Sequence, residues 1–306
     1  MKIKVIINTK VRDYSRERLT RLIGDCLSSH QLDFSPTAYR GHATWLARSA
    51  AAAGYDTIVA VGGDGTVNEV INGAAGRDVT IGIMPLGTAN DLAAFFGIPR
   101  NIHRACEIIQ RRTTQETDLL CVNGSLYATS GGIGLPCEVV DFANAIRSHG
   151  RTGRLLGRLL GRKIYVLATL LAVSRKKRRH NRVTIYHDGL RYGIDALTVM
   201  ADNLPFLGGR FRMSPGADPS DGVADLCLIK NSKSRLEVLS LLSRVMRGTH
   251  EGLPYVSLRR AGQLTIDCDN LQAFFGDGEI LQEARRFEVR VLPGALKLIV
   301  PAKDGG

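Results

Sequence analysis

The chain has 306 residues, of which 44% are hydrophobic and 23% charged, a composition typical of a globular protein with one large or two medium domains. No stretch is apolar over the roughly 20 residues that a membrane-spanning helix needs, and no signal-peptide pattern opens the chain. The six cysteines include no C-x-x-C pair, which excludes a zinc ribbon and a dithiol redox motif. These features predict a cytoplasmic protein.

The first 120 residues alternate between strand-like and helix-like patterns. The predicted strands cover residues 2–8, 57–61 and 80–85, and the predicted helices cover residues 15–29, 45–53, 67–75 and 88–96. Strands separated by helices of this length indicate βαβ units and a mainly parallel sheet. We therefore predict an α/β domain over residues 1–125.

After residue 117 the pattern changes to short β-rich segments separated by turn signals such as Val122-Asn123-Gly124. The predicted strands cover residues 119–122, 126–130, 182–187, 194–201, 223–229, 263–268, 287–292 and 297–300. They predict an antiparallel β domain over residues 126–306, with helical segments inserted at 142–180 and 235–247. We leave open that its last strand returns to the first domain.

The formal net charge of +12 is concentrated in one segment. No acidic residue occurs between Asp141 and Asp188, whereas twelve basic residues lie in the segment 147–182, as many as the excess of 41 basic over 29 acidic residues. Leucines recur there at helical spacing, and a basic amphipathic helix suits an anionic membrane surface. The alternative is a solvated basic face whose leucines pack on the β domain. Nucleic acid is disfavoured because Tyr165 is the segment's only stacking side chain.

A glycine-rich turn follows the second predicted strand. Residues 62–66 read G-G-D-G-T and lie between a strand end and a helix start. Glycines let a backbone approach a phosphate closely, and the N-terminus of a helix adds partial positive charge. The spacing is neither G-x-G-x-x-G nor a Walker A loop. The sequence therefore favours an anion site here, with a plain glycine turn capped by Asp64 as the alternative.

A second polar turn follows the next predicted strand, where residues 85–93 read P-L-G-T-A-N-D-L-A. Strands of a parallel sheet bring both turns to one carboxyl edge, where α/β sheets bind ligands. Together the two turns resemble the signature pair of the diacylglycerol kinase catalytic family, which includes sphingosine kinases and bacterial lipid kinases. NAD kinases and phosphofructokinases are more distant relatives. Residues 37–43, 208–225 and 276–279 are similar to further blocks of that family, in the same order.

The resemblance implies a Rossmann-like N-terminal domain of the NAD-kinase and phosphofructokinase kind, followed by a C-terminal antiparallel β-sandwich with inserted helices. It further implies an ATP-dependent lipid kinase that transfers the γ-phosphate to the hydroxyl of a lipid such as diacylglycerol. The residues that would surround ATP are Thr37, Gly62, Gly63, Asp64, Gly65, Thr66, Val67, Asn68, Thr88 and Asn90. Asp64 would lie near the triphosphate and its catalytic Mg²⁺, and Asp91 would shape the same pocket.

The resemblance also assigns roles to two later blocks. Glu279 would be the base that accepts the proton of the lipid hydroxyl. Asp221, with the backbone carbonyls of Asp218 and Val223, would hold a second, structural Mg²⁺, since oxygen ligands in a tight loop suit a hard cation. The implied enzyme acts in phospholipid biosynthesis and associates peripherally with an anionic membrane through the basic segment 147–182. A homodimer stays open.

The sequence departs from the family pattern in three places. The loop Asn8-Thr9-Lys10 lacks the usual proline and glycine, and Gly134-Leu135-Pro136 lacks the usual Asp-Ala. Gly276 replaces a branched residue, which we expect to loosen the strand that aims Glu279. These departures leave room for a non-catalytic membrane-binding protein of the same fold. An NAD-kinase-like enzyme is a second alternative, because NAD kinases share G-G-D-G-T, although they lack the second turn motif and the block at 276–279.

Overall fold

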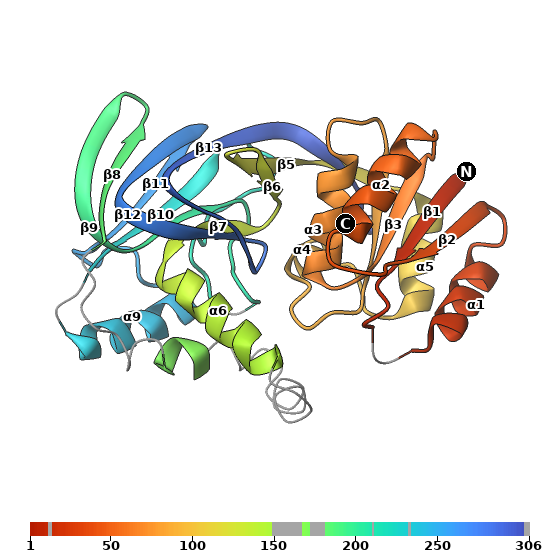
Figure 1. Ribbon diagram of the computed structural model, residues 1–306, viewed down its shortest axis with the longest axis horizontal. Helices are drawn as coiled ribbons and strands as arrows, with labels where there is room; N and C mark the ends of the chain where they lie inside the picture. The colour runs from red at the N-terminus through yellow and green to blue at the C-terminus, as the bar shows by residue number, and fades with distance from the viewer. Residues whose placement is uncertain (12–13, 149–166, 172–180, 210, 232–233, 303–306) are drawn as a thin grey trace. The chain divides into compact units, whose positions relative to one another are not determined.

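The computed structural model describes residues 1–11, 14–148, 167–171, 181–209, 211–231 and 234–302 (Figure 1). The chain forms two units, the first from residues 1–119 and 293–306 and the second from residues 120–292. Two strands, β5 (Thr114–Val122) and β13 (Glu279–Ile299), run from one unit into the other. Among the described residues, no helix is both long and apolar enough to cross a membrane.

The first unit is built on a parallel sheet. β1 (Lys2–Ile7) lies between β2 (Gln31–Pro36) and β3 (Thr57–Gly62), and β3 pairs with β4 (Thr80–Pro85), all in parallel. The end of β13 joins β4 in parallel on the far side. Every residue of β3 and β4 is buried, which explains why their sequences are continuous apolar runs rather than alternating patterns.

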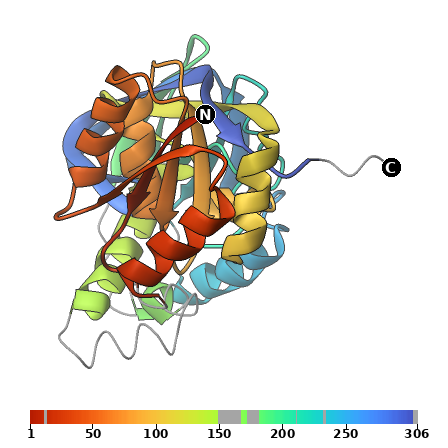
Figure 2. The same ribbon diagram turned by 90° about the vertical axis from the view of Figure 1, so that its right-hand side faces the viewer.

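Helices cover both faces of this sheet, as the turned view shows (Figure 2). α1 (Arg16–Cys26) and α5 (Ile102–Arg111) pack together and share one apolar core with β1, β3 and β4. α2 (His42–Ala52) and α3 (Asp64–Ala74) pack together on the other face, against β1 and β3. A shorter helix, α4 (Asp91–Phe95), follows β4. Both β-to-α turns singled out in the sequence therefore lie at the carboxyl edge of the sheet.

The second unit is antiparallel. The order β11-β10-β9-β7-β12-β13 runs through it, β8 pairs with β9 and β12, and β5 pairs with β6. The remaining strands are β6 (Ser125–Tyr127), β7 (Ser130–Gly134), β8 (Arg182–His187), β9 (Leu190–Asp202), β10 (Ala224–Lys230), β11 (Val256–Ala261) and β12 (Gln263–Gly276). The helices that the structure describes in it are α6 (Leu135–Ser148), residues 167–171 and α9 (Arg235–Arg247).

Two apolar cores lie on opposite faces of these strands, as the alternation of side chains along β12 shows. Phe274 packs with Tyr127 and Phe287 in one core, whereas the next residue, Phe275, lies in the other core with side chains of α6 and α9. Successive residues of a strand point to opposite faces, so one pair of phenylalanines serves both cores. Most of the basic segment 147–182 lies outside the described residues.

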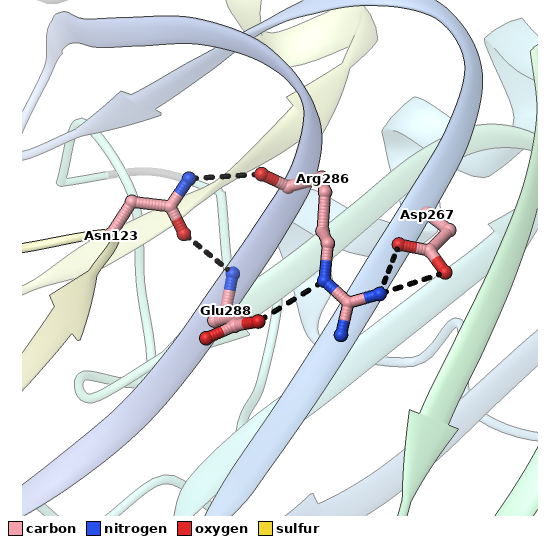
Figure 3. A network of polar contacts seen from close by, with 4 residues as sticks. All are labelled: Asn123, Asp267, Arg286 and Glu288. Atoms are coloured by element: carbon pink, nitrogen blue, oxygen red, sulfur yellow. Dashed lines mark hydrogen bonds and ion pairs between the residues drawn. The ribbon is translucent and has the colours of Figure 1, made fainter.

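The predicted turn at Val122-Asn123-Gly124 joins β5 to β6 and is fastened to β13 (Figure 3). Asn123 has a φ of 43° and Gly124 a φ of 92°. A two-residue hairpin turn of type I′ requires positive φ at both central residues. The Asn123 amide donates to the carbonyl of Arg286 over 2.9 Å and accepts the N–H of Glu288 over 2.8 Å. The Arg286 guanidinium in turn contacts the carboxylates of Glu288 and Asp267.

Candidate functional site

The carboxyl ends of the first three strands of the parallel sheet are joined by hydrogen bonds. Asn8, which follows β1, donates its backbone N–H to the carbonyl of Val61 over 2.9 Å and its side-chain Nδ2 to Thr66 Oγ1 over 2.7 Å. Thr37, which follows β2, donates its N–H to the carbonyl of Ile7 over 2.9 Å. The structure therefore brings Thr37 and Thr66 to one edge, with Asn8 between them.

The two glycine turns touch each other through their backbones. A Cβ atom added to Gly87 would lie 2.4 Å from the Cα of Gly63, a separation that real side chains do not show. The N–H of Leu86 also donates to the carbonyl of Gly62 over 2.8 Å. Only residues without a side chain permit this approach. The prediction that residues 62–68 and 87–91 share one edge is met in the first unit.

Asp64 links the two turns. It is the first residue of α3, and its carboxylate accepts two backbone N–H groups of the second turn, that of Asp91 over 2.7 Å and that of Asn90 over 2.8 Å. Both N–H groups stand at the start of α4, where no helical carbonyl can reach them. The carboxylate of Asp64 therefore caps α4 from the first turn of α3, a charge-assisted contact stronger than an ordinary hydrogen bond.

The second turn is held from its other side as well. The Asn90 side chain accepts the N–H of Gly87 over 2.9 Å and donates to the carbonyl of the same residue over 3.1 Å. Arg100 Nη2 donates to the carbonyls of Gly87 and Thr88 over 2.6 and 2.7 Å. Thr88 itself is exposed, whereas Asn90 and Asp91 are buried. The turn thus presents one hydroxyl to solvent while an arginine binds its carbonyls.

Three residues of this edge receive no role from the sequence: Asn8, which is noted there only as part of a loop that departs from the family pattern, Glu69 and Arg100. Asn8 follows a strand at the carboxyl edge, the same signal that identified the two turns, and could have been found by it. The Glu69 carboxylate accepts the N–H groups of Gly41 and Ala43 over 2.8 and 3.0 Å and so fixes the start of α2 beside α3. Arg100 lies beyond α4 in a stretch without a motif, so only the fold reveals its role.

The second unit holds the other predicted residues, beginning with the turn between β12 and β13. Asp277 and Gly278 have φ angles of 53° and 80°, a two-residue hairpin turn. The buried carboxylate of Asp277 accepts the N–H of Ala128 over 3.1 Å, and both the N–H and the hydroxyl of Thr129 over 2.8 and 2.6 Å. Its own N–H donates to the carbonyl of Ser130 over 3.1 Å. The turn is therefore firmly attached to residues 128–130.

Glu279, the first residue of β13, follows this turn and is partly buried. The structure corrects the expectation that Gly276 loosens the strand before it. A Cβ atom at Gly276 would lie 2.6 Å from Leu281 Cδ1 and 2.9 Å from Tyr127 Cβ, so these side chains already occupy the space of the absent branched residue. Tyr127 is fully buried. At Gly276 the strand is therefore packed by the side chains of Leu281 and Tyr127 instead of by a side chain of its own.

The loop predicted to hold a structural Mg²⁺ is closed by its own polar groups. Asp218 Oδ1 accepts the N–H and the hydroxyl of Ser220 over 3.0 and 2.6 Å. Asp221 accepts the N–H of Val223 over 3.1 Å and pairs with the Arg260 guanidinium. In the part of the chain that the structure describes, no group of three or more His, Cys, Asp or Glu side chains is placed to hold a metal ion. A site of one carboxylate and two carbonyls remains a prediction.

A buried acid, Asp202, lies at the end of β9. Its side chain is 0% exposed and accepts a hydrogen bond from the Ser214 hydroxyl over 2.7 Å. In the sheet it lies directly opposite Asp225 of the neighbouring strand β10. Burial raises the pKa of the Asp202 carboxyl to about 8, while the hydroxyls of Ser214 and Ser130 lower it and Asp225 raises it further. Because that pKa lies above neutrality, the carboxyl is mainly protonated at pH 7.

Comparison with known proteins places this geometry in a family. The family model described as diacylglycerol kinase catalytic domain matches residues 2–122, and the one described as YegS C-terminal NAD kinase beta sandwich-like domain matches residues 145–300. A protein named diacylglycerol kinase from Mycobacterium tuberculosis is 32% identical over 265 residues, covering 84% of this chain and 80% of that protein.

Further relatives point to the same family. A protein named diacylglycerol kinase from Bacillus subtilis is 28% identical over 247 residues, covering 79% of this chain and 77% of that protein. The crystal structure of a diacylglycerol kinase from Bacillus anthracis has the same fold, with a TM-score of 0.74 at 22% identity, covering 98% of this chain and 97% of the other. The chain therefore belongs to the diacylglycerol kinase catalytic-domain family and is a phosphotransferase of the lipid kinase class. The predicted family and fold class are confirmed.

The contact between the glycine turns predicts the effect of one added methyl group. Gly87→Ala should lower the free energy of unfolding by about 1–3 kcal/mol, because the new Cβ meets the backbone of Gly63 and the turns must separate. Denaturant unfolding measures this. Gly24→Ala is the control, since a Cβ there meets nothing within 4 Å in a helix, and it should not destabilise the protein. Equal stabilities of Gly87→Ala and wild type would contradict the described contact.

Asp202 predicts a pH dependence of stability. The unfolded chain has an aspartate pKa of about 3.9, well below the folded value, so ionisation stabilises the unfolded state as the pH rises toward 8. Asp202→Asn should therefore gain stability relative to wild type between pH 5 and pH 8, by up to about 4 kcal/mol. The neighbouring Tyr127 and Cys227 stay neutral over this range, because burial raises the pKa of each. Burial raises the pKa of Asp225 to about 6, so this neighbour ionises within the range and raises the pKa of Asp202 further. Denaturant unfolding at pH 5 and pH 8 measures this difference in the free energy of unfolding, and Asp25→Asn, at an exposed position, is the control. If both variants changed in stability equally between the two pH values, the raised pKa of Asp202 would be refuted.

Proposed function

We propose that this protein transfers the γ-phosphoryl group of ATP, bound with Mg²⁺, to the hydroxyl of a lipid such as diacylglycerol. The observation that carries the proposal is the pair of glycine turns held together by Asp64, because the turns bring backbone groups and a carboxylate together at the carboxyl edge of a parallel sheet, where α/β sheets bind ligands. Membership of the diacylglycerol kinase family and the names of the relatives support the choice of a lipid acceptor.

The first unit supplies the nucleotide site in this proposal. The N-terminus of α3 follows directly on Gly62 and Gly63, so the positive end of its dipole faces the phosphates. Thr37, Thr66 and Thr88 stand around the same edge as hydroxyl partners. Arg100, which binds the carbonyls of the second turn, adds positive charge beside it.

We propose that carboxylates hold Mg²⁺ at this edge. Asp64 and Asp91 would supply the carboxylate oxygens that hard cations prefer, and the Asp64 carboxylate, which accepts two N–H groups, keeps further lone pairs for an ion. Bound Mg²⁺ would neutralise charge on the triphosphate during phosphoryl transfer. For the second, structural Mg²⁺ we propose Asp221 with the carbonyls of Asp218 and Val223. That ion would compete with the Arg260 guanidinium, which pairs with Asp221 in this structure.

The second unit supplies the base. The Glu279 carboxylate would take the proton of the lipid hydroxyl, whose oxygen forms the new bond to the γ-phosphorus as the bond to the β-phosphate oxygen breaks and ADP leaves. Attachment of Asp277 to residues 128–130 fixes the turn from which Glu279 emerges. We further propose that the enzyme acts in phospholipid metabolism at the inner face of a membrane, to which the basic segment 147–182 draws it.

Asp64→Asn tests the nucleotide site. The amide replaces one acceptor oxygen with a donor and removes the negative charge, so kinase activity should fall to background while global stability drops by only about 1–3 kcal/mol. Asp56→Asn is a matched control, because Asp56 also accepts a backbone N–H, that of Lys2 over 2.6 Å, but stands at the opposite edge of the sheet before β3. Asp56→Asn should keep its activity. Near-normal turnover of Asp64→Asn would show that the nucleotide site does not lie at this edge of the sheet.

Glu279→Gln tests the base. The variant keeps the shape of the side chain but cannot accept the proton, so kcat should fall by about 10²- to 10⁴-fold while ATP affinity stays close to wild type. Steady-state kinetics and nucleotide titration separate the two quantities. Glu283→Gln, an exposed position on the same strand, should leave kcat unchanged. If Glu279→Gln instead kept its rate and bound ATP poorly, Glu279 would be a nucleotide or metal ligand.

A further inference from the structure

α9 carries apolar side chains on two opposite faces. Val238, Leu241 and Val245 are buried in the core beneath it. Leu236, in contrast, is 77% exposed, and Leu239 is 39% exposed. At about 100° per residue, Leu236 lies roughly 160° around the helix from Val238. Leu236 therefore points away from the core and has no packing role in the described structure.

A second helix adds leucines to the same side of the unit. In the short helix 167–171, Ala168 is fully buried against Val139 of α6, whereas Leu167 and Leu170 are 37% and 40% exposed. Both views show this helix and α9 on the same side of the second unit (Figures 1 and 2). We call Leu167, Leu170, Leu236 and Leu239 together the leucine face. Leu236 has the highest exposure of the large hydrophobic residues that the structure describes.

The sequence around α9 is mainly basic, whereas α6, which packs against helix 167–171, carries the exposed acids Glu138 and Asp141. Between Asp225 and Glu251 the sequence has one acidic residue, Glu237, and five basic ones: Lys230, Lys233, Arg235, Arg244 and Arg247. Arg244 and Arg247 are exposed in the last turns of α9, beyond the two leucines. Leucines that lead into arginines on one helix surface match the order of acyl chains and anionic headgroups at a bilayer.

We propose that the leucine face is a docking surface for an anionic phospholipid bilayer, with its leucines entering the acyl boundary and Arg244 and Arg247 lying among the headgroups. The proposal rests on the proposed lipid substrate, which must be taken from such a surface. A second copy of the chain is a poorer occupant. Two copies joined through this face would bring like charges together, and four leucines are few for the roughly 800 Å² per partner of a stable dimer.

Vesicle co-sedimentation tests the docking surface. With vesicles of phosphatidylcholine and phosphatidylglycerol in equal parts, the double variant Leu236→Ser, Leu239→Ser should bind about tenfold or more weakly than wild type. The matched control is Leu190→Ser, Leu271→Ser, which removes two leucines that are 57% and 59% exposed on β9 and β12. This control should bind as wild type does.

Salt separates the contribution of the arginines. Wild-type binding should weaken with added sodium chloride, because the ions screen the attraction to the anionic headgroups. Arg244→Gln, Arg247→Gln should bind more weakly and respond less to salt. Unchanged vesicle binding by the leucine double variant, or no binding by wild type, would overturn the proposal. So would a loss of self-association in that variant, seen by analytical ultracentrifugation, without loss of vesicle binding.

Turnover of a soluble short-chain diacylglycerol keeps this test apart from the proposed function. All variants in the docking test should phosphorylate the soluble lipid at the wild-type rate, since none of the changed residues belongs to the nucleotide site or to the Glu279 turn. If wild type itself fails to phosphorylate it, the proposed function fails, and the comparison of vesicle binding between the two leucine variants still decides the docking surface.

Discussion

The carboxylate of Asp64 accepts the backbone N–H groups of Asn90 and Asp91, and the candidate nucleotide site depends on this contact. α4 has five residues, too few to be stable as a helix without outside partners. Its first N–H groups find their acceptor at the start of α3, directly after the first glycine turn, so the Asp64 carboxylate holds the two turns together. The bond from the Leu86 N–H to the Gly62 carbonyl joins them a second time, and the absence of side chains at Gly63 and Gly87 permits their close approach.

The same device recurs in the second unit. The carboxylate of Asp277 accepts N–H groups from Ala128 and Thr129, and the turn that leads to Glu279 is thereby fixed. In both units a short acidic side chain holds a neighbouring backbone segment, and the groups expected to do chemistry stand beside it. Charge-assisted hydrogen bonds to backbone are stiff and strong, which suits a reaction that depends mainly on positioning.

How much the sequence could predict varied with the kind of signal. Buried parallel strands such as β3 and β4 are continuous apolar runs, and the turns after them carry glycine and polar residues, so the edge of the sheet was predictable. β2 (Gln31–Pro36) is not predicted, because its alternation of apolar and polar residues rests on two apolar side chains only, Leu32 and Phe34, and none of its residues is fully buried. The contacts of Asp64 and Arg100 join residues far apart in the chain, so only the fold could reveal them. The expectation for Gly276 is wrong because the side chains that fill its space, those of Leu281 and Tyr127, lie on other strands.

The central claim is that the site at the carboxyl edge of the first unit serves phosphoryl transfer from ATP to a lipid hydroxyl. Incubation of the protein with γ-labelled ATP, Mg²⁺ and, in separate reactions, diacylglycerol, phosphatidylglycerol, sphingosine and NAD tests it most directly. Separation of the products shows which acceptor carries the label. The account predicts label in a lipid product, with diacylglycerol the preferred acceptor, and none in NAD. Label in NAD alone, or in no acceptor, would contradict it.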